Sequence, residues 1–102
     1  MKYTVLFMDL AEQDYYAISE YLANFYPSTI EKFLDELEKY TATLEDNPRA
    51  FEVYEHVPSY RRMVVMDFLV FYKIKEDDKS VEIHRILHGS RDIKRFLDHT
   101  WV

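Results

Sequence analysis

The chain has 102 residues, 48% of them hydrophobic, and no cysteine, which suits one domain with a modest core and excludes disulfide bonds. Its net charge of −6 excludes a general nucleic-acid binder, because such a protein carries a basic surface. No apolar run is long enough to span a membrane and residues 1–8 lack the pattern of a signal peptide, so we expect a soluble, cytoplasmic protein without a membrane partner.

The first half of the chain predicts a short strand followed by two helices. Residues 2–8 favour β-structure. Apolar residues then recur three and four positions apart in two stripes, as expected of amphipathic helices that each bury one face. The first stripe is Ala11, Tyr15, Ile18, Leu22 and Phe25, and the second is Ile30, Phe33, Leu34, Leu37, Thr41 and Leu44. Because residues 1–47 hold three basic and ten acidic side chains, we expect the helices to present an acidic surface to solvent.

Cap signals predict the ends of these helices. Asp9 with Glu12, and Ser28 with Glu31, have the spacing of capping boxes at the two helix starts. Pro48 ends the second helix, because proline disfavours helical geometry in the residue before it. The link between the helices is so short that they should pack as an antiparallel hairpin.

The second half of the chain predicts three strands. Residues 60–66 and 68–74 are rich in β-favouring side chains, and residues 81–87 alternate between apolar and polar. Residues 76–79 are polar and of hairpin length, whereas residues 47–59 have no period and should form a loop. We therefore expect neighbouring strands to pair largely antiparallel.

The chain ends in a pattern typical of a short helix. Ile93, Phe96 and Leu97 have the spacing of one helical face. The resulting order β-α-α-β-β-β predicts an α+β fold, in which a helical hairpin covers one face of a mainly antiparallel sheet. We expect residues 1–102 to form a single domain.

The chain has one glycine, and its position is informative. Gly89 lies at the end of the last predicted strand, between His88 and the charged pair Arg91-Asp92. Glycine adopts positive φ and allows a close backbone approach without steric cost. Gly89 therefore has a structural role, which is either an unusual backbone shape or a strand-ending turn.

The sequence gives little support for metal or cofactor chemistry. His84 and His88 are four residues apart on a predicted strand, which separates them by about 13 Å and prevents them from sharing one zinc ion. One glycine cannot form a glycine-rich phosphate loop, and no serine lies in a nucleophile elbow. We expect neither a metal nor a cofactor.

An arginine on the last strand is expected to be structural. Arg85 falls in the same alternating row as Val81, Ile83 and Leu87, which should face the core. Burying an unpaired charge is strongly unfavourable, so Arg85 needs an acidic partner. Asp14 in the first helix is the candidate.

Other arginines are candidates for partner contacts. Arg61 and Arg62 are adjacent on a predicted strand, so their side chains point to opposite faces. One should meet the helical layer and pair with a carboxylate, while the other faces solvent or a partner. Arg91, after the glycine, belongs to the more exposed charged pair and is a further contact candidate.

Aromatic side chains are also candidates for a protein interface. The chain has nine tyrosines and seven phenylalanines, an aromatic content of 17%. Tyrosine and tryptophan are enriched at interfaces. Phe51, Tyr54 and Trp101 are the residues that we expect to be exposed for such contacts.

The segment Arg85-Ile-Leu-His-Gly-Ser-Arg-Asp-Ile93 closely resembles the signature that ends the sheet in the RelE/ParE toxin superfamily. Upstream features are similar as well: a short first strand, a helical hairpin ending in Leu44-Glu-Asp-Asn-Pro48, then Tyr60-Arg-Arg62 and the strand Phe68-Leu-Val-Phe-Tyr-Lys-Ile74. The resemblance covers nearly the whole chain. It implies the toxin of a type II toxin–antitoxin, or plasmid stabilization, system that is held inactive by a cognate antitoxin.

The resemblance implies two mechanisms. RelE-type members cut messenger RNA on the ribosome with basic residues and a C-terminal tyrosine. Arg61 and Arg91 match two basic positions, whereas Met63, Leu69 and Leu97 stand where a base, a cation and the tyrosine would be. Losing several such groups removes general acid–base help of about 10²–10⁴-fold. ParE-type members lack this cluster and are associated with inhibition of DNA gyrase by binding.

We therefore expect a ParE-like toxin that acts by protein contact, with DNA gyrase as the target. Its contact residues would be Arg61, Arg62, Arg91 and Trp101. One alternative is a ribosome-dependent mRNA endonuclease, in which Arg61, Arg91 and His88 would be the catalytic candidates. A second alternative is a diverged, non-toxic member that pairs with an antitoxin or with itself as a homodimer.

Overall fold

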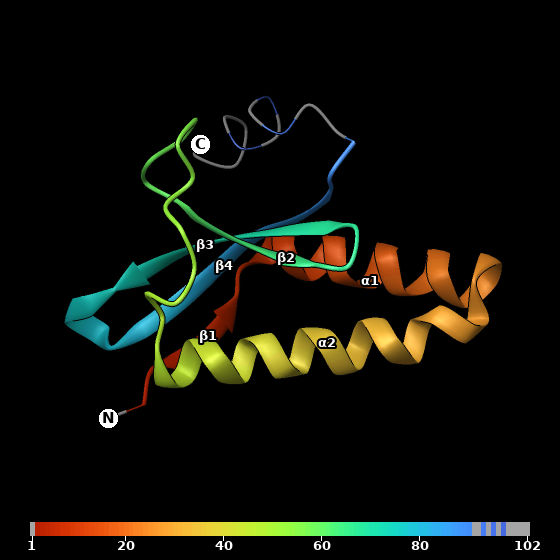
Figure 1. Cartoon of the computed structure of the whole chain (residues 1–102), viewed down its shortest axis with the longest axis horizontal. Coiled ribbons are helices and arrows are strands. Elements are labelled where there is room, and N and C mark those ends of the chain that lie inside the picture. Colours follow the sequence, from red (N-terminus) through yellow and green to blue (C-terminus); the bar gives the residue numbers. More distant parts are fainter. Residues whose placement is uncertain (1, 91–92, 94, 96, 98–102) are drawn as a thin grey trace.

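Two helices cover one face of a four-stranded sheet in the computed structural model, which describes residues 2–90 together with 93, 95 and 97 (Figure 1). The loop that follows the helices crosses to the other side of the sheet. The predicted α+β architecture and element order are confirmed.

The helical hairpin consists of α1, Asp9–Phe25, and α2, Pro27–Asp46. Each helix buries part of its predicted stripe; the buried members are Ala11, Leu22, Phe33, Leu37 and Leu44. These side chains are apolar at helical spacing, so the hydrophobic effect drives that face onto the sheet. No helix within the described residues is long and apolar enough to cross a membrane.

The two predicted capping boxes are wrong. Helix α1 begins at Asp9 itself and is preceded by Met8, whose N–H donates to the carbonyl of Ile83 at 2.9 Å. Helix α2 begins at Pro27, one residue before Ser28, and neither helix start has a side-chain cap bond. Strand pairing fixes the first start, and the second uses a proline whose φ is already helical.

The sheet contains β1, Thr4–Phe7, β2, Arg61–Val65, β3, Phe68–Lys75, and β4, Ser80–His88. Its order is β1-β4-β3-β2, so β1 and β2 are the edges. Strand β1 pairs parallel with β4, while the other two pairings are antiparallel. The sheet is thus mixed but mainly antiparallel, as predicted.

A bulge interrupts β4. Arg85 lies opposite Phe71 while Ile83 lies opposite Tyr72, so the residue between them has no partner on β3. The extra residue breaks the alternation of side chains. Ile83 packs in the core beneath the helices, whereas Leu87 packs on the other face. The prediction that Arg85 stands in one row with both residues is therefore wrong.

The sheet has a hydrophobic cluster on each face. The larger one lies beneath the helices and includes Phe33, Leu37, Met63, Val65, Val70, Tyr72 and Ile83. The smaller one, which we call the outer-face cluster, consists of Val57, Tyr60, Phe71, Leu87, Ile93 and Leu97. Ile93 and Leu97 are helical, as the terminal pattern predicted, but Phe96 and Trp101 lie outside the described residues.

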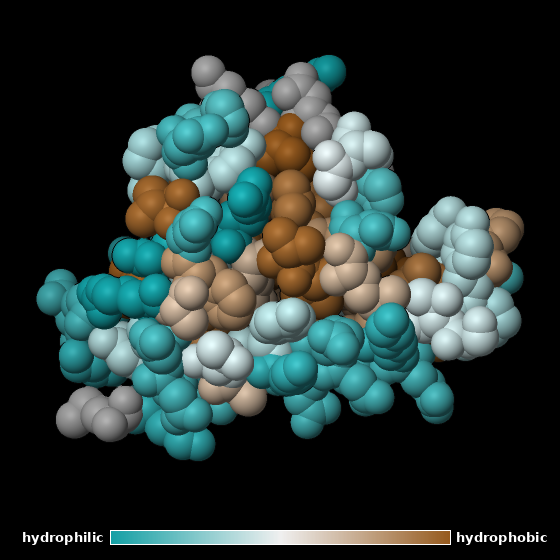
Figure 2. Space-filling model, in the orientation of Figure 1, coloured by the Kyte–Doolittle hydropathy of each residue, from teal (hydrophilic) through white to brown (hydrophobic). Residues whose placement is uncertain are grey.

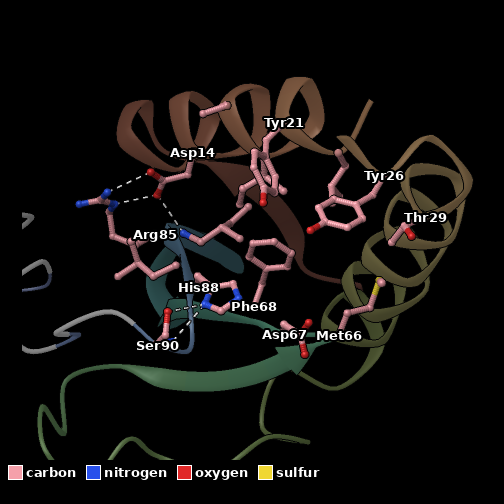
Figure 3. Close-up of a pocket in the computed structure, with 15 residues that line it drawn as sticks. Asp14, Tyr21, Tyr26, Thr29, Met66, Asp67, Phe68, Arg85, His88 and Ser90 are labelled. Carbon is pink, nitrogen blue, oxygen red and sulfur yellow. Dashed lines mark hydrogen bonds and ion pairs between the residues drawn. The ribbon is translucent and has the colours of Figure 1, made fainter. Parts of the chain in front are cut away.

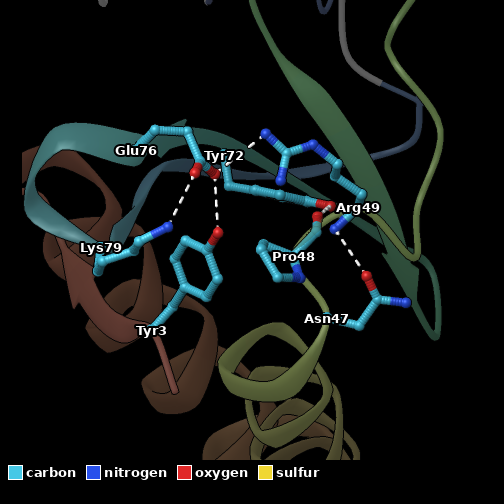
Figure 4. Close-up of polar contacts among 7 residues, drawn as sticks. All are labelled: Tyr3, Asn47, Pro48, Arg49, Tyr72, Glu76 and Lys79. Atoms are coloured by element: carbon cyan, nitrogen blue, oxygen red, sulfur yellow. Dashed lines mark hydrogen bonds and ion pairs between the residues drawn. The ribbon is translucent and has the colours of Figure 1, made fainter. Parts of the chain in front are cut away.

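An ionic cluster around Glu76 joins three separate segments at one end of the sheet (Figure 4). The hydroxyl of Tyr3 donates to Glu76 Oε1 at 2.8 Å, and Arg49 Nη2 lies 3.0 Å from the same oxygen. Lys79 Nζ lies 3.2 Å from Glu76 Oε2. The cluster therefore connects the start of β1, the loop after α2 and the β3–β4 turn.

Stability should depend on the ionisation of Glu76. The hydrogen bond from Tyr3, followed by that from Lys79, lowers the pKa of Glu76 from 4.5 to about 2. A folded-state pKa below the unfolded one contributes stability above pH 4.5, and that contribution disappears as the pH falls toward 2. We expect Glu76→Gln to flatten the acid limb of a thermal-melting curve between these values. An unchanged acid limb would contradict the assignment.

Candidate functional site

A groove of about 730 Å³ opens between the helical hairpin and one end of the sheet (Figure 3). The second half of α1 and the start of α2 form one wall, and the β2–β3 turn with the end of β4 forms the other. We call it the tip groove; its lining includes Tyr21, Leu22, Tyr26, Met66, Phe68 and His88. The end of β4 carries the signature segment singled out in the sequence, so that segment borders a concave surface.

The hairpin tip exposes three aromatic side chains beside this groove. Tyr21, Phe25 and Tyr26 have exposed fractions of 51%, 68% and 51%. Their rings contact one another, with centroids 5.2 Å apart for Tyr21–Phe25 and 5.8 Å apart for Tyr21–Tyr26. A hydrogen bond with Tyr26 raises the pKa of Tyr21 above its ordinary value. The prediction that Phe25 belongs to the buried stripe is wrong, because α1 extends beyond the sheet at this point.

The β2–β3 turn forms the opposite rim and contains a strained residue. Met66 has a φ of 57°, in the left-handed region that favours glycine. Such a conformation costs on the order of 1–3 kcal/mol in a non-glycine residue. Next to it, the carbonyl of Asp67 accepts a hydrogen bond from the Gly89 N–H at 2.9 Å.

Gly89 itself adopts an ordinary conformation. Its φ is not positive, and a Cβ at this position would lie 3.5 Å from the Asp67 carbonyl oxygen, an ordinary contact. Of the two interpretations of this glycine, the structure supports the strand-ending turn. A positive φ occurs instead at Met66, in the adjacent β2–β3 turn on the same wall of the groove.

His88 is held in place by the turn that follows it. The N–H of Ser90 donates to His88 Nδ1 at 3.1 Å, and the Ser90 hydroxyl lies 2.7 Å from the same nitrogen. The ring of His88 packs edge-on against Phe68, with centroids 5.5 Å apart. Because Nδ1 accepts a hydrogen bond from a backbone N–H, the proton of the neutral ring lies on Nε2.

The predicted pairing of Arg85 with Asp14 is present. Arg85 Nε and Nη2 donate to the two carboxylate oxygens of Asp14 at 2.7 and 2.9 Å. The backbone N–H of Ile86 donates to the same carboxylate at 2.9 Å. Asp14 therefore forms an ion pair with Arg85. It also accepts a hydrogen bond from a backbone N–H of β4 that lies beyond the end of β1.

Arg61 and Arg62 lie on opposite faces, as predicted, but neither pairs with a carboxylate of the helices. Arg61 Nη1 donates to the backbone carbonyl of Phe51 at 2.7 Å. The guanidinium of Arg62 lies 5.7 Å from the centre of the Tyr54 ring, on the outer face. Both arginines thus hold the loop after α2 against β2. Arg91 and Trp101 lie outside the described residues.

The aromatic residues of that loop are less exposed than the sequence suggested. Phe51 is half-buried against the core beneath the helices, and its ring lies 5.8 Å from that of Tyr40. Tyr54 is half-buried against the outer-face cluster, with its ring 5.0 Å from that of Phe71. The prediction that Phe51 and Tyr54 are exposed interface residues is wrong, because the loop folds back onto both faces of the sheet edge.

The positions expected to carry a nuclease's groups lie in apolar surroundings. Met63 is buried beneath the helices, on the face opposite to Arg62. Leu69 packs against the outer-face cluster and Leu97 is fully buried within it. No group of three or more histidine, aspartate or glutamate side chains within the described residues could hold a metal ion.

The amino-acid sequence matches the family described as the ParE toxin of the type II toxin–antitoxin system parDE, over residues 5–93. The chain belongs to this family. No curated protein is significantly similar to this ParE-family chain in sequence.

Solved structures show the same fold as this ParE-family chain. It superposes with a TM-score of 0.68 on a chain of the chromosomal ParDE TA system from P. aeruginosa, with 21% identity over 84% of this chain and 95% of that one. It superposes with a TM-score of 0.60 on a chain of the toxin–antitoxin complex RelBE2 from Mycobacterium tuberculosis, with 20% identity over 86% and 99% of the two chains. The RelE/ParE fold is thereby confirmed.

Reasoning from the sequence missed the exposed hairpin tip of this ParE-family protein. Tyr21 lies off the apolar stripe of α1 and could have been noticed, since a tyrosine there cannot reach the core. Tyr26 precedes the proline that starts α2, which is a solvent-facing position in a tight helical hairpin. The cluster depends on where α1 overhangs the sheet, which periodicity alone does not show.

Proposed function

We propose that this chain is the toxin of a type II toxin–antitoxin system and that it acts by binding a protein target, with DNA gyrase as the expected one. A cognate antitoxin neutralises it in the cytoplasm, and plasmid stabilization is the expected role. Membership of the ParE family supports the toxin assignment. The contact mechanism is supported by features of the outer face and of the hairpin tip.

The observation that carries the proposal is the apolar outer face of the sheet. Phe71, Leu87 and Leu97 are buried there, and Leu69 packs against them. Figure 2 shows hydrophobic residues gathered over the centre of this view, where the sheet lies in Figure 1. A nuclease must place charged groups around a scissile phosphate, and leucine and phenylalanine can neither neutralise charge nor transfer protons.

Two of the three nuclease candidates, Arg61 and His88, lie far apart on the sheet. Arg61 lies opposite Tyr72 on β3, and His88 lies opposite Phe68, four residues away along the same strand. At the rise of a β-strand this separation is roughly 13 Å. Arg61 is also engaged with the carbonyl of Phe51. The two residues do not form a site for one phosphate.

The hairpin tip has the properties of a protein-binding surface. Exposed aromatic residues are enriched at the centres of interfaces, where they contribute much of the binding energy. Tyr21, Phe25 and Tyr26 form such a group, and the tip groove beside them can receive side chains of a partner. We assign this surface to the target.

Inhibition of gyrase by tip variants tests the assignment. We expect wild-type protein to inhibit supercoiling of relaxed plasmid, and the double variant Tyr21→Ala/Phe25→Ala to need at least about tenfold more protein. Tyr16→Ala is the matched control, because Tyr16 is 63% exposed on the same helix but lies outside the tip groove. Equal inhibition by wild type and tip variant would remove the tip as the contact surface.

A further inference from the structure

The turn between β2 and β3 contains an amino acid that its backbone geometry disfavours. Val65 pairs with Phe68, so only Met66 and Asp67 join the two strands. Met66 has a φ of 57°, whereas the φ of Asp67 is not positive. A two-residue hairpin turn with a positive φ at its first position alone is of type II′, and that position prefers glycine. The requirements of the turn alone would therefore select glycine at this position.

The other left-handed non-glycine residue in the described part of the chain has contacts that account for its side chain. Lys79 has a φ of 50° in the β3–β4 turn. Its Nζ lies 3.2 Å from Glu76 Oε2 and 5.3 Å from the centre of the Tyr3 ring. The strain at Lys79 is thus accompanied by stabilising contacts of its ammonium group. A thioether forms no ion pair, so the strain at Met66 needs a different explanation.

The side chain of Met66 lies at the surface of the tip groove. It is half-buried at the border of the core beneath the helices, and it lines the groove together with Phe68 and Tyr26. Figure 3 shows this side chain directed toward Thr29 at the start of α2, across the groove. The thioether therefore forms part of the concave surface that a bound partner would contact.

The turn is held in its strained conformation by the end of β4. The Gly89 N–H donates to the carbonyl of Asp67 at 2.9 Å, which connects the turn to the neighbouring strand. Strained residues persist where the surrounding structure fixes them, and they are concentrated at binding and active sites. Methionine is also enriched at protein interfaces, because its flexible, polarizable side chain adapts to irregular apolar surfaces.

Position and amino-acid type together specify the role of this residue. Tyr21 and Tyr26 line the tip groove and also belong to the exposed aromatic tip, so the groove is continuous with the surface assigned to the target. We infer that Met66 is a contact residue for the protein target, and that an apolar side chain of the target packs against it in the tip groove. This inference rests on the proposed function, because it adds a residue to the surface assigned there.

Substitutions of Met66 distinguish a binding role from a role in folding. Glycine adopts positive φ without strain, so Met66→Gly should leave the melting temperature unchanged or raise it. The same variant should need at least about tenfold more protein to inhibit supercoiling by gyrase, because the apolar contact is lost. Met66→Asn should inhibit equally poorly, since asparagine tolerates the left-handed region but is polar. Met66→Leu keeps an apolar side chain and should inhibit within about threefold of the wild type.

The matched control removes the other left-handed side chain. Lys79→Gly changes the same kind of backbone position in the β3–β4 turn, and Lys79 does not line the tip groove. This variant should inhibit supercoiling within about threefold of the wild type. Only its inhibition is compared, because the substitution also removes the contact with Glu76.

The outcomes separate this inference from the function on which it rests. If the wild type inhibits gyrase and Met66→Gly inhibits it equally well, the contact role is overturned while the proposed function stands. The same holds if Met66→Gly weakens only the binding of the antitoxin, or if its inhibition and its melting temperature fall together. If the wild type does not inhibit gyrase, both are overturned. Loss of inhibition without loss of thermal stability, together with retained inhibition by Met66→Leu, supports the inference.

Discussion

Replacing Asp14 with alanine is expected to lower the free energy of unfolding by about 3–5 kcal/mol, the range for breaking a buried ion pair from one side. The side chains of Arg85 and Asp14 are 12% and 15% exposed, so the arginine left behind would lack both a partner and full hydration. The substitution would also remove the acceptor for the Ile86 N–H. Denaturant unfolding followed by circular dichroism measures the change.

The control for Asp14 is another acidic residue of the same helix. Glu20 is exposed and has no ion pair within the described residues, so Glu20→Ala should change stability by no more than about 0.5 kcal/mol. A loss below about 1 kcal/mol for Asp14→Ala would show that the ion pair does not bind α1 to the edge of β4. Asp14→Asn should fall between the two, because an amide can still accept one of the hydrogen bonds.

Replacing Leu37 with alanine should cost about 2–5 kcal/mol in unfolding free energy. Leu37 is 4% exposed and belongs to the core beneath the helices, so the substitution leaves a cavity between α2 and the sheet. Leu10 is the matched control, since it is 37% exposed and its truncation creates no such cavity. If Leu37→Ala changed stability by less than about 0.5 kcal/mol, the packing of the two helices on the sheet would be contradicted.

The spacing of apolar residues predicted the elements of this fold well, because the side chains that a helix or strand buries recur with the period of that element. The stripe containing Phe33, Leu37 and Leu44 identified α2 and its buried face. Alternating apolar residues identified β4, and the need of Arg85 for an acidic partner identified Asp14 across 71 positions of sequence. The need of a buried charge for an opposite charge therefore predicted the pair correctly, although the row assigned to Arg85 was wrong.

The errors arose where tertiary structure overrides a local signal. Asp9 and Ser28 satisfy the capping-box spacing, yet strand pairing at Met8 and the proline at position 27 set the helix starts. The bulge after Ile83 depends on how β4 pairs with β3, which no single strand reveals.

The candidate site was predicted less completely than the fold. The signature around Gly89 lies at the end of β4, which borders the tip groove. The aromatic cluster of Tyr21, Phe25 and Tyr26 was missed, because Phe25 has the spacing of the buried stripe although its side chain is exposed. Its exposure follows from the overhang of α1 beyond the sheet.

We propose that this ParE-family protein acts by contact and does not cut RNA. Its most direct test adds purified protein in parallel to DNA gyrase with relaxed plasmid and to ribosomes programmed with a defined messenger, whose cleavage is followed by toeprinting. We expect inhibition of supercoiling that the antitoxin relieves, and intact messenger in the decoding site. Codon-dependent cuts in that site, with supercoiling unaffected, would contradict the account.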